Sequence, residues 1–164
     1  MAPLRKRLAY LVVLICVTFQ PMVTVANSSR EAAAFGCEQG AASMAPIIQV
    51  LWERLKDYPR ERSRAEITQA NRELKEAFEK IEDKLFRQDK DVKTTMVERW
   101  SRDGVSAFEQ SVRISELELI SSSKRLTIWI AFDLLIKAVN DHRPLTQDRA
   151  QRQIEQECRA ELRR

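Results

Sequence analysis

The chain has 164 residues, of which 44% are hydrophobic, 32% are charged and only 3 are glycine. This length fits one domain, and the apolar content is sufficient for a hydrophobic core. Tight hairpin turns, strained catalytic elbows and phosphate-binding loops all depend on glycine. The composition therefore argues against all-β folds, Rossmann folds and P-loop enzymes.

The N-terminus has the pattern of a secretory signal peptide. Three basic residues at positions 5–7 precede an uncharged apolar segment over residues 8–19. The small residues of Thr24-Val25-Ala26 follow and predict cleavage before Asn27. We therefore divide the chain into a signal peptide (residues 1–26) and a mature domain (residues 27–164). The alternative is an uncleaved membrane anchor, because residues 8–26 carry no charge over 19 positions.

Removal of the signal peptide changes the meaning of the net charge. The full chain has 28 basic and 24 acidic residues, a net charge of +4, and no acidic residue lies in positions 1–26. Cleavage leaves 25 basic and 24 acidic residues, a net charge of +1. A protein that binds nucleic acid needs a concentrated basic face, so the balanced charge argues against a nucleic-acid partner.

Cleavage also removes Cys16 and leaves two cysteines, Cys37 and Cys158. One disulfide between them is the simplest prediction for an exported chain, in the periplasm or outside the cell. Such a bridge closes a loop of about 120 residues, and the chain-entropy estimate for that length is roughly 5 kcal/mol. Two cysteines and the single histidine, His142, do not complete a four-ligand zinc site, so no metal is predicted.

The first half of the mature chain predicts three helices. Residues 27–40 are interpreted as a loose entry with a short helical turn around Cys37. A helix then begins after Ser43, with Pro46 in its first turn, and stops at Tyr58-Pro59. Ser63 and Glu66 have the spacing of a capping box at the start of the second helix. The third, shorter helix covers residues 92–102, after the charged run 89–91, and Gly104 ends it.

The second half predicts three more. One helix covers residues 105–120, and the serines at 121–123 are interpreted as a break, with Ser123 capping the next helix. The segment from Leu126 to Val139 is apolar nearly all the way round, as in the central helix of a bundle. Thr146 caps the last helix and places Cys158 on its apolar stripe. The predicted fold is an all-α single bundle of five to six helices, its ends tied by Cys37–Cys158.

The sequence contains few features that indicate an enzyme. No nucleophile elbow, zinc-binding helix motif or dinucleotide-binding glycine run occurs, and the lone His142 lies at a helix end. We assign no catalytic residue and no cofactor.

One polar group on the central helix is a candidate site. Asp133 and Lys137 lie four residues apart on an otherwise apolar helix, with Asn140 continuing that side and Trp129 one turn before. Charges in such a setting need partners. They form either an intrahelical ion pair at the edge of the core or the polar floor of a cleft for a partner or ligand.

Two functions from different classes follow. The first is an exported, non-enzymatic protein, such as an accessory, inhibitor, immunity or chaperone-like factor, that acts on an unidentified protein partner through a helix face. It would not remain inserted in the membrane after cleavage. The second is a small all-α enzyme or ligand-binding protein that uses cationic side chains inside the bundle. A deep pocket lined by two or more arginines or lysines would favour the second.

Overall fold

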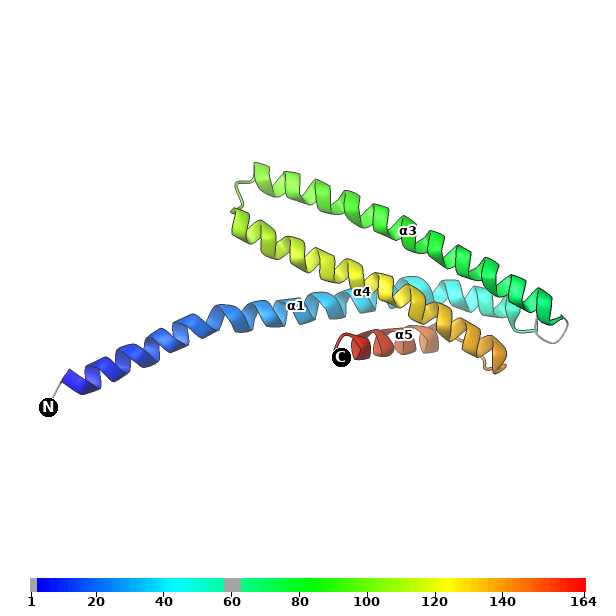
Figure 1. The fold of residues 1–164 in the computed structure, drawn as a ribbon, viewed down its shortest axis with the longest axis horizontal. Coiled ribbons are helices and arrows are strands. Elements are labelled where there is room, and N and C mark those ends of the chain that lie inside the picture. The colour runs from blue at the N-terminus through cyan, green and yellow to red at the C-terminus, as the bar shows by residue number, and fades with distance from the viewer. Residues whose placement is uncertain (1–2, 58–62) are drawn as a thin grey trace.

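A computed structural model describes the backbone of residues 3–57 and 63–164, and the side chains from residue 28 onward within those ranges. The described chain forms four helices: α1 (Pro3–Leu55), α3 (Arg64–Arg102), α4 (Ala107–Asn140) and α5 (Gln147–Glu161) (Figure 1). The predicted all-α class is confirmed. The predicted count of five to six helices is wrong, because the expected breaks at residues 89–91 and 121–123 lie inside continuous helices; the expected loose entry at residues 27–40 is helical as well.

The loose entry expected over residues 27–40 is part of α1. Gly36 and Gly40 are buried, and they lie where α1 crosses α4. A methyl group on Gly36 would lie 2.5 Å from the Ile120 carbonyl oxygen, and one on Gly40 would lie 2.2 Å from Thr127 Oγ1. The two glycines therefore serve the close approach of two helices rather than a flexible segment. Pro46 lies in the interior of α1 and not in a first turn.

The first expected break, at residues 89–91, lies inside α3. The face of α3 that packs on α4 continues through this region, but several of its members are polar. Asp89 accepts a hydrogen bond from the hydroxyl of Ser121, and Lys93 Nζ lies 3.0 Å from Glu118 Oε1. The helix continues because these charged residues have partners on α4, which a search for apolar periodicity does not detect.

The serines at 121–123 are the second expected break, and α4 passes through them without interruption. Ser121 donates to Asp89 of α3, and the buried Ser123 donates to the Leu119 carbonyl at 2.8 Å within its own helix. Their small side chains face the neighbouring helices, where Ser123 packs beside Gly36. Ser123 is therefore an interface residue, and its predicted role as a helix cap is wrong.

The predicted helix ends agree better with the structure. Ser63 and Glu66 form the predicted capping box, with the Ser63 N–H donating to Glu66 Oε2 at 2.8 Å. Thr146 caps α5 by accepting a hydrogen bond from the Arg149 N–H. Gly104 adopts the predicted left-handed conformation, with φ of 72°, directly after α3. Local polar side chains and glycine thus indicate helix ends correctly where no tertiary partner intervenes.

The helices are arranged around α4, which contacts all three others. The C-terminal half of α1 runs parallel to α4, and α5 runs back along both of them; α3 runs antiparallel to α4 (Figure 1). The N-terminal part of α1, dark blue, projects beyond the other helices (Figure 1). The predicted signal peptide, residues 1–26, and the cleavage site before Asn27 lie outside the residues whose side chains are described.

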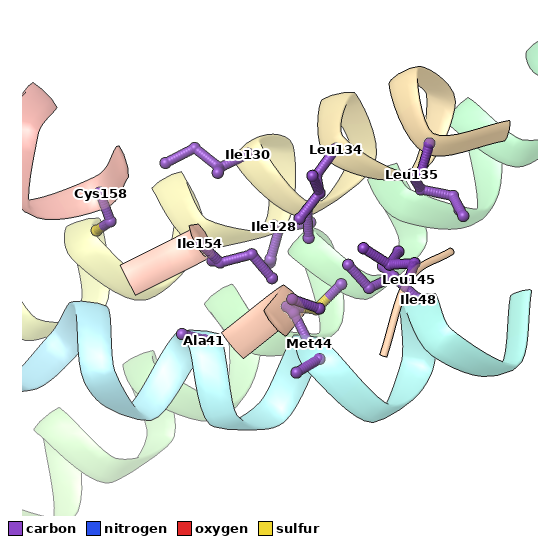
Figure 2. Close-up of a cluster of buried hydrophobic side chains, with 14 of the residues drawn as sticks. Ala41, Met44, Ile48, Ile128, Ile130, Leu134, Leu135, Leu145, Ile154 and Cys158 are labelled. Atoms are coloured by element: carbon purple, nitrogen blue, oxygen red, sulfur yellow. The ribbon is translucent and has the colours of Figure 1, made fainter. Parts of the chain in front are cut away.

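The core lies where α1, α4 and α5 meet, and Figure 2 shows side chains from all three helices in it. From α3, Phe78 reaches this core and is fully buried. Small residues on α1 allow the other two helices to approach closely. The buried members that define the core include Ala41, Met44, Ile48, Ile128, Ala131, Leu135, Ala150 and Ile154. Within the part of the chain that the structure describes, no helix combines the length and apolarity needed to span a membrane.

Candidate functional site

The predicted disulfide is present, and it positions the C-terminal half of α5. Cys37 of α1 and Cys158 of α5 are bonded with a Cα–Cα distance of 5.7 Å, and both side chains are fully buried. The residues before and after Cys158 in the sequence lie on opposite sides of α5 and line two different grooves. Glu157 lines a groove on the α4 side of α5, whereas Arg159 lines a groove on the α1 side. One covalent bond therefore holds the helix that forms a wall of both grooves.

The first groove, which we call the polar groove, lies between α4 and α5 and has a volume of about 500 Å³. It brings together three of the four residues predicted from the central helix, namely Trp129, Asp133 and Lys137. Its described lining residues are Leu126, Trp129, Ile130, Asp133, Lys137, Glu157, Ala160, Glu161 and Arg164. The fourth predicted residue, Asn140, is exposed at the end of α4 and is not part of this lining.

Asp133 and Lys137 do not satisfy each other. Both side chains are exposed, and no salt bridge joins them or links either one to another described residue. On the opposite wall, Arg164 is paired with Glu161 at 2.7 Å. The polar groove therefore presents Asp133 and Lys137, four residues apart and without a salt bridge to any described residue, beside Trp129. Glu157 on the α5 wall forms no salt bridge with a described residue either, and it accepts a hydrogen bond from the Gln153 amide at 3.0 Å.

Lys137 also borders a smaller hollow of about 110 Å³ at the other end of α5. Arg143 lines it from the α4–α5 connection and Arg149 from the first turn of α5, and Asp141 is paired with Arg143 at 3.5 Å. Cationic side chains thus continue from the polar groove toward the start of α5.

Trp129 is held in place by a carboxylate on α3 that the sequence analysis missed. The indole Nε1 donates to Glu82 Oε2 at 3.0 Å, and Arg125 donates to Glu82 Oε1 through Nε at 3.1 Å and Nη2 at 2.9 Å. Glu82 follows Phe78 by four residues, on the face that packs against α4. A charged residue at a core-facing position of a helical stripe was the available signal for this contact.

Aromatic rings extend the same contact between α3 and α4. Phe132 lies edge-on to Phe78, with ring centroids 5.2 Å apart, and edge-on to Trp129 at 6.0 Å. Edge-to-face pairs at these distances are attractive beyond the area that they bury. Trp129 therefore has a fixed position, with one edge in the contact with α3 and another at the polar groove.

The second groove, which we call the arginine groove, lies between α1, α4 and the end of α5 and has a volume of about 820 Å³. Its charged lining residues are Arg30, Arg159 and Arg163. The other lining residues are small or apolar: Ser29, Ala33, Ala34, Leu119 and Leu162. This groove could not be predicted from the sequence, because Arg30 lies more than a hundred residues before Arg159 and Arg163.

His142 ends α4 and has no contact with either groove. Its φ of 51° lies in the left-handed region, and its N–H donates to the Val139 carbonyl at 3.3 Å. The next N–H, that of Arg143, donates to the Ala138 carbonyl at 2.9 Å, which completes a Schellman-type helix end. Among the described residues no group of three or more histidine, cysteine, aspartate or glutamate side chains is arranged to hold a metal ion.

Comparison with known proteins gives no match. No family model, no curated protein and no solved structure is similar to this chain.

Proposed function

We propose that this chain is an exported interaction protein that binds a protein partner across the polar groove, after removal of residues 1–26. The observation that carries the proposal is the combination of the unpaired Asp133 and Lys137 with the fixed ring of Trp129. Interfaces concentrate their binding energy in tryptophan, tyrosine and arginine, and a held aromatic ring loses little conformational freedom on binding. Unpaired charges of both signs allow a partner to pair with each and fix its register.

The disulfide supports the export part of the proposal. Stable disulfides belong to oxidising compartments such as the periplasm or the extracellular space. In addition, the N-terminal part of α1 extends away from the bundle (Figure 1), so its removal would leave the arrangement of α1, α4 and α5 intact.

The alternative is a small all-α enzyme or ligand-binding protein that uses cationic side chains within the bundle. The arginine groove and the hollow beside Lys137 have the cationic lining that this alternative requires. Both lie at the surface, however, while the centre of the described bundle is filled with buried apolar side chains. We therefore prefer the interaction proposal.

The proposal is tested by cross-linking and capture from cell-envelope extracts, using the exported protein and three variants as bait. We expect the wild type to enrich a specific protein, and Lys137→Glu and Trp129→Ala to lose it. Lys75→Glu is the control, since Lys75 lies on the exposed face of α3 away from the groove. N-terminal sequencing of the same preparation should begin at or near Asn27. Capture that is equal for all four baits would refute the proposed site, and an intact Met1 in the membrane fraction would support the anchor.

A further inference from the structure

The arginine groove lies where α5 has ended but α1 and α4 continue beside each other (Figure 1). The last turn of α5 lies against the small side chains of α1, with Leu162 bordering the groove beside Ala33 and Ala34. Alanines let a packed segment approach the helix backbone closely. Ala33 and Ala34 of α1, which lie beside the end of α5, therefore form an open floor for the groove.

The walls of this groove carry charge of one sign. Among the described residues no acidic one lines it, and its three arginines come from α1, from α5 and from the turn that follows α5. Arg159 pairs with Glu155 at 2.6 Å, outside the lining, whereas Arg30 and Arg163 form no salt bridge with any described residue. Clustered cations without counter-charges repel one another, and an anionic occupant relieves that repulsion.

A second observation concerns Arg159 itself. Its Nε atom is buried and has no hydrogen-bond partner, although Nη2 of the same guanidinium group contacts Glu155. A buried donor without a partner is costly, and a guanidinium group offers two parallel donors to one carboxylate. Arg159 thus lines this groove with a side chain that is 40% exposed, and no protein group satisfies its Nε donor.

We infer that the arginine groove docks a short acidic, amphipathic segment of a partner protein, with apolar side chains on the alanine floor and carboxylates on the three arginines. The volume of about 820 Å³ is large for a single small anion and lies near the upper end of ordinary ligand sites. Charge complementarity selects an acidic segment, and the alanine and leucine floor selects one with an apolar face. This inference concerns a groove distinct from the polar groove and stands independently of the function proposed there.

The test is fluorescence anisotropy with the purified, oxidised protein and a labelled helical peptide made of glutamate and leucine. The same peptide with glutamine, or with lysine, in place of glutamate serves as a probe control. We expect saturable binding of the acidic peptide alone, which weakens as salt is added. Arg30→Gln and Arg163→Gln should each weaken binding by about threefold, and the double variant by about tenfold.

Three variants distinguish a site from nonspecific attraction. Ala34→Trp fills the floor and should abolish binding without removing charge. Arg152→Gln, which removes an exposed arginine elsewhere on α5, should bind as the wild type does. Lys137→Glu should also bind normally, so that failure of the polar groove and failure of this groove are separable. Circular dichroism establishes that each variant is folded.

The inference is overturned if the acidic peptide does not bind, or if the Arg30/Arg163 double variant binds it as tightly as the wild type does. It is also overturned if dodecanoate binds saturably at Arg163 while the peptide does not, because the groove would then be a site for an anionic amphiphile. Equal affinity for the glutamine peptide would show that charge plays no part.

Discussion

The crossing of α1 and α4 at two glycines offers a sharp test of the packing. Gly36→Ala would place a methyl group 2.5 Å from the Ile120 carbonyl oxygen and 2.9 Å from its Cα atom, both of them backbone. Gly40→Ala would place one 2.2 Å from Thr127 Oγ1 and 3.0 Å from Thr127 Cγ2, both in a side chain. Both substitutions crowd the interface, but the nearest atom to the Gly36 methyl position belongs to the backbone, whereas the two nearest to the Gly40 methyl position belong to a side chain that Thr127→Ala shortens.

Two opposing effects determine how much each glycine-to-alanine substitution changes the stability of the protein. Alanine is more favourable than glycine inside a helix by about 1 kcal/mol, whereas overpacking a close interface costs about 1–3 kcal/mol. We expect crowding to prevail, with a net loss of up to about 2 kcal/mol for each variant. For a domain of this size that corresponds to a fall in melting temperature of up to about 8 °C.

The assay is urea and thermal unfolding followed by circular dichroism, arranged as two double-mutant cycles. Thr127→Ala removes the two atoms that Gly40→Ala would strike, so the pair should be less destabilising than the sum of its parts by about 1 kcal/mol or more. Ser123→Ala keeps its Cβ atom, which is 2.7 Å from the methyl position on Gly36, so that pair should be additive.

The exposed Ala42 serves as a control for the difference in helix propensity between alanine and glycine. Ala42→Gly should cost about 1 kcal/mol without changing any contact with α4. The reasoning fails if Gly36→Ala and Gly40→Ala stabilise the protein. It also fails if both cycles show the same coupling.

Three further predictions concern contacts described above. Reduction of the Cys37–Cys158 bridge should lower the free energy of unfolding by up to about 5 kcal/mol, while most of the helix content remains at low temperature. Thermal melting with and without reductant measures this loss. Alkylation that labels either cysteine in the oxidised protein would contradict the bridge. Glu82→Ala should cost about 2 kcal/mol and increase hydrogen exchange in α3, because it strands the indole N–H of Trp129; unchanged exchange would refute this anchor. His142→Gly should raise stability by up to about 1 kcal/mol, since only a non-glycine residue is strained at φ of 51°, and a lower melting temperature would contradict that.

Features that depend on a few neighbouring residues could be predicted from the sequence. The Ser63–Glu66 capping box and the Thr146 cap are local hydrogen-bonding patterns, and Gly104 supplies the left-handed residue at a helix end. The disulfide could be predicted for a different reason. Once the predicted signal peptide is removed, only Cys37 and Cys158 are left to pair.

Helix continuity could not be predicted in the same way, because it depends on partners remote in sequence. The charged run 89–91 looks like a linker until Ser121 is known to face Asp89. The serines at 121–123 look like a break until the glycines of α1 are placed beside them. Polar and small residues at a helix interface have no apolar period, so a search for such a period divides each long helix in two.

The candidate site was predictable to the same limited degree. Trp129, Asp133 and Lys137 share one side of a single helix, and their spacing of four residues was enough to group them. The opposite wall, with Glu157 and Glu161, comes from α5, whose position follows from the docking of Cys158 against α1. No spacing within the chain indicates which flank of α5 would face α4.

The parallel pairing of α1 with α4 also determines when the protein can fold during synthesis. Every main partner of α1 lies in α4 or α5, and the disulfide joins residues 121 positions apart. The hairpin of α3 and α4 has local contacts and can form as soon as both helices exist, whereas α1 has no main partner until α4 has been made. Cys37 therefore emerges long before Cys158. During that interval Cys37 remains a free thiol, and α5 then supplies the second sulfur atom and completes the cover over α1.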